Sequence, residues 1–379
     1  MSHTQPSDAA ATVAEFLDPA PFADLLAGYC LDVQAGQKVV VRSTALASPL
    51  LLELQRAILQ RGAWPTFRVE LPGEAAGFYD HALPSQLDDF DDLEMAQAKR
   101  LDALLGIQAP HDPSELAGVD PTQLARVARA RRPVREATLR KRWCSTLWPT
   151  AAGAQQAGMG LEEFAAFVRR AMFLDQPDPV AAWRGLHAFQ ASLIEGLSGA
   201  RELRIEAEGT DLTLSVNGRV WVNSDGKRNM PSGEVFTGPV ETSAAGRVRF
   251  TIRSSPAGGD VDGVELTFRG GEVVEARADV GEEYLRQALA TDDGAKRLGE
   301  VGIGTNFGIA RPIGAILFDE KIGGTVHLAL GRSYPETRGK NQSALHWDLI
   351  CDLRAGGRLT ADGETVMQDG RFVVPGLSA

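Results

Sequence analysis

Apolar residues in the first half of the chain follow two alternating spacings. A helical pattern at residues 22–29 precedes a short apolar run at 38–43 (KVVVRS). A second helical pattern at 51–58 precedes alternating positions at 66–71, and a further apolar run spans 101–107. Strands that alternate with helices predict βαβ units and a mostly parallel sheet.

The spacing changes near residue 200. Helical patterns at 161–174 and 179–197 end there, and short runs with strand-like alternation follow, separated by Gly, Asn and Asp. Closely spaced short strands favour antiparallel pairing. We therefore predict an α/β N-terminal domain with a mostly parallel sheet over residues 1–200. Residues 201–379 are predicted to form an α+β domain rich in antiparallel strands.

Composition excludes several classes of protein. A chain of 379 residues with 44% hydrophobic content can bury large cores, which excludes wholesale disorder and a disulfide-stapled miniprotein. Its net charge of −11 argues against duplex nucleic acid and anionic membranes as partners, because both require clustered cations. Three widely spaced cysteines fit a reducing cytoplasm rather than a disulfide framework. Residues 1–12 lack the pattern of a secretory signal, and no stretch approaches the roughly 20 apolar residues of a membrane span.

Two further patterns have ordinary explanations. Residues 126–142 hold eight basic side chains, which a solvated helix face and turn explain better than an acidic partner does. The glycines at 302, 304 and 308 depart from the spacing of a dinucleotide loop and do not follow a predicted strand. We therefore expect no nucleotide site there.

The second half carries the candidate chemistry. In a strand, His346 and Asp348 would face one side while Trp347 packs on the other. Taken singly, His327 fits a core histidine in an apolar strand, and Glu300 fits the solvated end of a helix-like run at 292–300. Together the acidic and imidazole residues suit a divalent metal site. The full set is Glu234, Glu300, Glu320, His327, His346 and Asp348. Many carboxylates beside only two histidines favour two ions, because carboxylates bridge ions and offset their charge.

These segments resemble the motifs of the M29 family of metallo-aminopeptidases. NMPSGEVFTGP (229–239) and LGEVGIGTN (298–306) are similar to the family's two Glu-bearing segments. HLALGRSYP (327–335) resembles its His–Tyr motif, and HWD (346–348) its final H-x-D pair. A weaker resemblance elsewhere, for example GQKVVV at 36–41, extends the similarity over nearly the whole chain.

The resemblance implies an activity and a role for each residue. It implies a metal-dependent aminopeptidase that acts on short peptides, forms a homodimer with an enclosed cavity and uses two divalent ions (Zn, Co, Mn or Mg). The implied ligands are Glu234, Glu300, His327, His346 and Asp348. Glu300 would also carry the proton of the attacking water, and Tyr334 would stabilise the oxyanion. Glu320 is a further expected ligand, although this chain reads DEK where the family has DEN, with two extra residues before His327.

Two other functions remain open from the residues alone. His327, His346 and Asp348 could form the two-His-one-carboxylate triad of a mononuclear non-heme iron ring-cleaving dioxygenase. Glu234, Glu300 and Tyr334 would then have no role. The same fold could also serve a non-catalytic binding protein, for which an intact ligand set would be unnecessary.

Overall fold

A computed structural model describes residues 13–254 and 259–373. The chain divides into two units, the first of Met1–Val180 with Gly226–Met230 and the second of Ala181–Asp225 with Pro231–Ala379. This division places most of helix α11 (Pro179–Leu197) in unit 2, whereas the predicted domain boundary near residue 200 placed the whole helix in the first domain. The domain division itself stays a prediction. Residues 1–12, expected to lack a secretory signal, lie outside the described residues.

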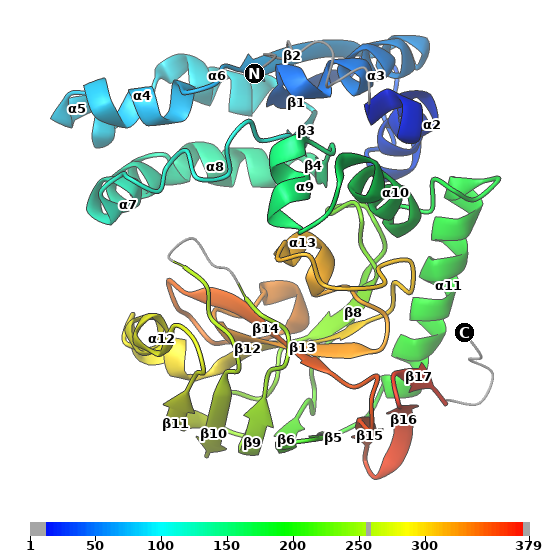
Figure 1. The fold of residues 1–379 in the computed structure, drawn as a ribbon, viewed down its shortest axis with the longest axis vertical. Helices are drawn as coiled ribbons and strands as arrows, with labels where there is room; N and C mark the ends of the chain where they lie inside the picture. Colours follow the sequence, from blue (N-terminus) through cyan, green and yellow to red (C-terminus); the bar gives the residue numbers. More distant parts are fainter. Residues whose placement is uncertain (1–12, 255–258, 374–379) are drawn as a thin grey trace. The chain divides into compact units, whose positions relative to one another are not determined.

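Unit 1 contains a four-stranded sheet (Figure 1). Its strands are β1 (Lys38–Thr44), β2 (Trp64–Glu70), β3 (Ala103–Gln108) and β4 (Arg142–Leu147). All neighbours pair in parallel in the order β2-β1-β3-β4, which confirms the predicted parallel sheet. After β1 the chain forms β2 on one side of it and then β3 on its other side. The strand order therefore reverses between β1 and β3.

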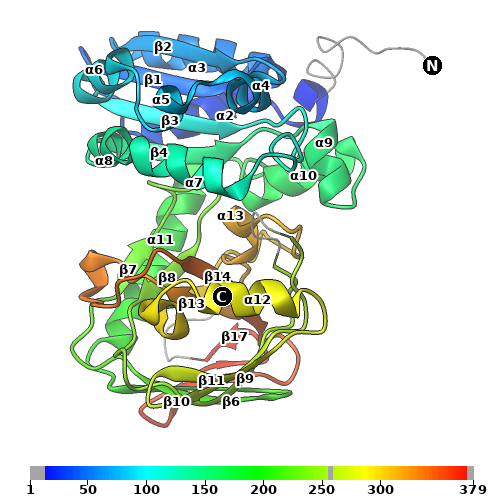
Figure 2. The same ribbon diagram turned by 90° about the vertical axis from the view of Figure 1, so that its left-hand side faces the viewer.

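Helices lie on both faces of this sheet (Figure 2). They are α2 (Pro19–Asp24), the π-helix Leu25–Cys30, the 3₁₀ turn Ala45–Ala47, α3 (Ser48–Gln60), α4 (Glu74–His81), α5 (Pro84–Leu87), α6 (Asp92–Arg100), α7 (Pro121–Ala130), α8 (Arg132–Leu139), α9 (Ala151–Gln156) and α10 (Leu161–Ala171). Asp18 caps α2 by accepting from the Ala20 amide, and Pro19 occupies its first turn.

The basic segment 126–142 runs through α7, α8 and β4. On α7, Arg126 pairs with Asp88.

Unit 2 contains two mainly antiparallel sheets and the helices α11, α12 (Glu282–Leu289) and α13 (Ile316–Asp319). The eight-stranded sheet, in spatial order, consists of β11 (Glu272–Arg277), β10 (Glu265–Arg269), β9 (Ala245–Arg249), β6 (Thr210–Ser215), β5 (Glu202–Ala207), β15 (Arg358–Ala361), β16 (Glu364–Gln368) and β17 (Arg371–Phe372). The five-stranded sheet consists of β14 (His346–Asp352), β13 (Thr325–Gly331), β12 (Leu298–Gly304), β8 (Glu234–Thr237) and β7 (Val222–Ser224). The expected antiparallel α+β half is confirmed.

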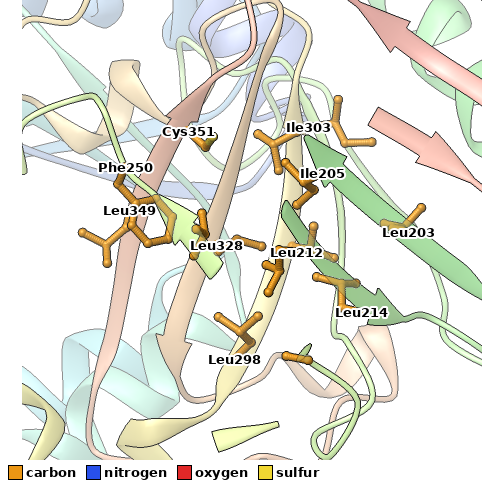
Figure 3. Packing of buried hydrophobic residues seen from close by; sticks show 14 of the residues in the cluster. Leu203, Ile205, Leu212, Leu214, Phe250, Leu298, Ile303, Leu328, Leu349 and Cys351 are labelled. Atoms are coloured by element: carbon orange, nitrogen blue, oxygen red, sulfur yellow. The ribbon is translucent and has the colours of Figure 1, made fainter. Parts of the chain in front are cut away.

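A hydrophobic core joins the two sheets of unit 2 (Figure 3). Leu203, Ile205 and Leu212 of the eight-stranded sheet lie in one buried cluster with Leu328 and Leu349 of the five-stranded sheet. Because side chains alternate across a strand, burying one face of β12, β13 and β14 in this core turns the other face away from it. That second face positions the candidate residues.

Cys30, Cys144 and Cys351 are free and buried. Within residues 13–254 and 259–373, no helix has the length and apolar character needed to cross a bilayer.

Candidate metal centre

One face of the five-stranded sheet collects five of the candidate side chains. Their positions are Glu234 on β8, Glu300 on β12, His327 on β13, and His346 and Asp348 on β14. Glu300 pairs with Ala329, and Ala329 pairs with Asp348, so these three form one row across the sheet. The other candidate residues, Glu234, His327 and His346, lie two or four positions from this row, counted along their own strand or along the strand with which they pair. Alternate residues of a strand share a face, so all five lie on the same side. Residues that are distant in sequence therefore lie on one face of the sheet.

A β-bulge gives Glu300 its orientation. Leu298 pairs with Leu330, but Glu300 pairs with the preceding residue of β13, so Gly299 is an extra residue in β12. A bulge changes the face on which the following side chains lie. Leu298 consequently packs in the core while Glu300 lies on the polar face.

The expectation that Glu300 ends a helix was wrong. Within residues 292–300, the helical part is the short 3₁₀ turn Asp293–Lys296, and β12 begins two residues after it. Pairing of β12 with β8 and β13 on both sides overrides the local helical pattern.

Three of the candidate side chains have a glycine as their register partner. His327 is opposite Gly302, His346 is opposite Gly331, and Glu234 is opposite a third glycine, Gly304. A Cβ atom on Gly302 would lie 2.1 Å from both Cε1 and Nε2 of His327. The imidazole therefore occupies the space that a side chain at position 302 would need.

Gly302→Ala is expected to lower the free energy of unfolding of the metal-free protein by about 1–3 kcal/mol, because the His327 ring must move out of a well-packed position. Denaturant unfolding measures this change. Gly185→Ala is the matched control, since α11 leaves open space there and alanine favours a helix by up to about 1 kcal/mol. Equal stability of wild type and Gly302→Ala would contradict the described ring position.

The five side chains form two groups that share Glu300. One is Glu234, Glu300 and His327, and the other is Glu300, His346 and Asp348, with ligand atoms within 4.8 Å of one another in each group. His327 Nε2 lies 3.4 Å from Glu234 Oε2 and 3.3 Å from Glu300 Oε1. His346 Nε2 lies 3.8 Å from Glu300 Oε2 and 3.5 Å from Asp348 Oδ2. The two oxygens of Glu300 thus face different imidazoles.

Burial removes these groups from the water that would solvate their charges. Glu234 and Glu300 are each 5% exposed, and His327 is fully buried. Burial raises the pKa of Glu234 to about 7 and that of Asp348 to about 6. Burial alone would lower the pKa of His327, but its hydrogen bond to Glu300 and the nearby carboxylates raise it to about 10. The shift of His327 shows that the neighbouring carboxylates favour a positive charge, whereas the shifts of Glu234 and Asp348 reflect first the cost of burying a carboxylate.

The donor atoms fit divalent cations. Glu234 Oε2, Glu300 Oε2 and His327 Nδ1 are buried without a hydrogen-bond partner among the described residues. Buried polar atoms in native proteins nearly always have a hydrogen-bond partner, so carboxylate oxygens without one point to a ligand of opposite charge. A mixed set of carboxylate oxygens and imidazole nitrogens suits Zn, Co or Mn, and its oxygens also suit Mg.

Glu320 belongs to neither group of the described residues. It lies at the C-terminal end of α13, and its carboxylate accepts a hydrogen bond from Lys321 Nζ. Lys321 is fully buried and also lies 3.4 Å from Glu234 Oε1. Glu320 as a metal ligand stays a prediction, and a buried ammonium competes for its carboxylate.

Tyr334 lies beside His346. It follows β13 and precedes the 3₁₀ turn Pro335–Thr337. Its ring centroid is 5.0 Å from that of His346 and 5.8 Å from that of Phe236. Burial and the nearby carboxylates raise the pKa of Tyr334, so the phenol stays protonated and can donate a hydrogen bond.

Sequence reasoning missed two supporting residues. Gln190 of α11 is fully buried, and its Nε2 donates to the Glu234 backbone oxygen and to Thr305 Oγ1, both at 2.9 Å. The signal in the sequence that could have identified Gln190 is an amide side chain on the buried face of a helix. Lys321 was noticed only as a departure from the family motif, and nothing in the local pattern predicts a fully buried lysine.

Comparisons with known proteins place the chain in a family. The family model described as thermophilic metalloprotease (M29) matches residues 20–372. Aminopeptidase 2 of Geobacillus stearothermophilus is 31% identical, over 93% of this chain and 96% of that protein. Aminopeptidase T of Thermus aquaticus is 33% identical, over 70% of this chain and 75% of that protein. The solved structure of wild-type AmpT from Thermus thermophilus covers 94% of this chain and 99% of its own, with a TM-score of 0.81 and 27% identity. The chain therefore belongs to the M29 family of metalloproteases, and its enzyme class is that of a metallo-aminopeptidase.

Proposed function

We propose that this enzyme removes the N-terminal residue of short peptides by means of two divalent ions that share Glu300. The observation that carries the proposal is that the two oxygens of Glu300 face different imidazoles, each with one further carboxylate nearby. Adjacent ligand groups with a shared carboxylate are what a two-metal hydrolytic site requires.

Each residue has a role in this proposal. Glu234 and His327 would hold one ion, His346 and Asp348 would hold the other, and Glu300 would contribute to both. When bound, the two ions would acidify a water molecule and polarise the scissile carbonyl. Glu300 accepts the proton of the attacking water and passes it to the leaving amine. The Tyr334 phenol donates a hydrogen bond to the developing oxyanion.

Glu320 and Lys321 are assigned to the edge of the same site. Glu320 is proposed as a sixth ligand, reached when its carboxylate gives up the Lys321 ammonium. Lys321 offsets the charge of Glu234, from which it is separated by 3.4 Å. A buried carboxylate without such a partner would be costly.

The short-peptide preference rests on the assembly that the family resemblance implies. We propose a homodimer whose enclosed cavity admits short peptides but not the N-terminus of a folded protein. A cytoplasmic location is proposed as well, because three free, buried cysteines suit a reducing compartment.

The iron dioxygenase alternative is less well supported. A two-His-one-carboxylate site needs both histidines around one ion. Among the described residues, His327 and His346 fall into different groups, and each group has two carboxylates. A non-catalytic binding role gives no reason for the unpartnered carboxylate oxygens of Glu234 and Glu300.

Metal content tests the proposal. Elemental analysis of purified protein is expected to give two divalent ions per chain, and strong chelation should abolish hydrolysis of an amino-acid amide until Zn, Co or Mn is restored. Asp348→Asn should retain one ion, because it removes a ligand from one group only. Glu234→Gln should likewise retain one, since it weakens the other group.

The outcomes separate the candidate functions. One iron per chain with no peptidase activity would support the dioxygenase. Full activity of a verified metal-free sample would overturn the proposal. Light scattering that shows an active monomer, or efficient trimming of a folded protein's N-terminus, would remove the enclosed dimer from it.

A further inference from the structure

Unit 1 contains a cavity that has no part in the metal centre. Its volume is about 750 Å³, which lies in the usual range for small-molecule sites. Residues at the carboxyl ends of β1, β2 and β3 line it, together with α4 and the loop that follows β3. All of its lining residues lie between positions 42 and 145, whereas the metal-centre residues belong to unit 2.

The position of this cavity in the sheet is the usual one for ligands. Open α/β sheets bind ligands outside the carboxyl ends of their strands, where the strand order reverses. In the order β2-β1-β3-β4 that point lies between β1 and β3. Arg42 of β1 and Gly106 of β3 are register partners there, and both line the cavity.

Two arginines are paired on the adjacent strands β1 and β2. The register places Arg42 directly beside Arg68 of β2, and like charges at paired positions destabilise a sheet. Arg68 has a partner, because its guanidinium lies 3.3 Å from Glu74. Arg42 Nε is buried and has no hydrogen-bond partner among the described residues, and the same holds for His111 Nε2. Arg42 thus places a positively charged guanidinium, which has no ion-pair partner in the described part of the chain, at a strand position where an apolar residue would fit.

The acidic groups around the cavity are mostly engaged locally. Glu74 accepts from the Leu71 amide, Glu115 accepts from the amides of Ala75 and Ala76, and Asp112 accepts from the Ser114 amide. Glu70 lines the cavity as well and is exposed. Of the three arginines in the lining, Arg68 pairs with Glu74 and Arg131 lies 3.8 Å from Glu94. Arg42 is the one without an ion pair among the described residues, and it is therefore the arginine best placed to bind an incoming anion.

We propose that this cavity binds a small molecule whose oxyanion, a carboxylate or a phosphate, pairs with the guanidinium of Arg42. A planar guanidinium presents two parallel N–H donors to such a group. The rings of Phe78 and Tyr79 line the same cavity and offer contact to a planar part of the ligand. The site is independent of the proposed peptidase mechanism.

Three probes of similar size test the anion requirement. Benzoate carries a carboxylate, phenyl phosphate carries a phosphate, and benzamide is the neutral counterpart of benzoate. Ligand-observed NMR on the full-length, metal-loaded protein should show binding of at least one anion and no binding of benzamide. The anion that binds more tightly identifies carboxylate or phosphate as the natural group. Equal binding of benzamide, or no binding of either anion, would overturn the proposal.

Two variants locate the binding. Arg42→Met should weaken it about 10- to 100-fold, the scale for losing a hydrogen bond to a charged group, with a melting temperature at or above that of wild type. Gly106→Val should abolish it without removing charge, because open space surrounds a Cβ atom there and valine suits a strand. Arg132→Met, in an exposed pair with Glu136 on α8, is the control and should bind as wild type does.

The metal centre is the competing site for these probes, since anions also ligate metal ions. Binding that survives His327→Ala but is lost in Gly106→Val supports the cavity in unit 1. Binding that survives both cavity variants, or that is lost in His327→Ala, would place the probe at the metal centre and overturn the proposal.

Discussion

Glu300→Gln is expected to lower turnover of an amino-acid amide by at least about 100-fold, the scale for loss of a general base. Glutamine keeps the size of the side chain but cannot carry the proton, and it replaces a negative ligand oxygen with a neutral amide. Since Glu300 faces both His327 and His346, the variant should also retain less than the full complement of metal. Steady-state kinetics and elemental analysis of the same sample measure the two effects.

Glu275→Gln is the matched control for this substitution. It makes the same chemical change at an exposed position on β11 of the same unit. Its turnover and metal content should equal those of wild type. Near-normal turnover of Glu300→Gln would remove Glu300 from the mechanism, whatever its metal content.

Tyr334→Phe is expected to lower turnover by roughly 10²–10³, the usual effect of removing one oxyanion donor. The change keeps the ring that lies beside His346 and Phe236 and deletes only the hydroxyl. Because the phenol is held protonated at the edge of the ligand groups, its hydrogen bond should strengthen as charge develops on the substrate oxygen. Metal content and melting temperature should therefore stay close to wild type while kcat falls.

The competing explanation is that Tyr334 only packs against its neighbours. In that case Tyr334→Phe would melt near wild type and turn over normally, and Tyr334→Ala would lose stability through the missing ring. A fall in kcat for phenylalanine with an unchanged melting temperature separates the catalytic role from the packing role.

Local pattern was sufficient for much of the fold. Alternating helical and apolar segments before residue 180 predicted the parallel sheet of unit 1, because each β strand of a βαβ unit must be buried by its own helices. The short alternating runs after residue 200 predicted the antiparallel strands for a similar reason, since one of their faces packs in a core. The i, i+2 relation of His346 and Asp348 also followed from strand geometry alone.

Motif resemblance supplied what local pattern could not. No spacing rule connects Glu234 to Asp348 across more than 100 residues. Residue chemistry grouped them as a candidate metal set, and the family motifs then implied a role for each. Pattern alone misplaced Glu300 at the end of a helix, because residues 292–300 contain good helix formers and the deciding contacts come from β8 and β13.

Sequence alone was enough to identify the α/β and α+β halves and the family to which the chain belongs, and it supplied a candidate set of metal ligands. These depend on composition, local periodicity and short motifs, which are properties of neighbouring residues. The bulge at Gly299, which turns Glu300 toward two imidazoles, and the room that Gly302 leaves for the His327 ring arise only in the tertiary structure. It alone also buried Lys321 beside Glu234 and aligned Arg42 with Arg68. The physical reason is that register, burial and close approach arise between strands that are distant in sequence, so no window along the chain contains them.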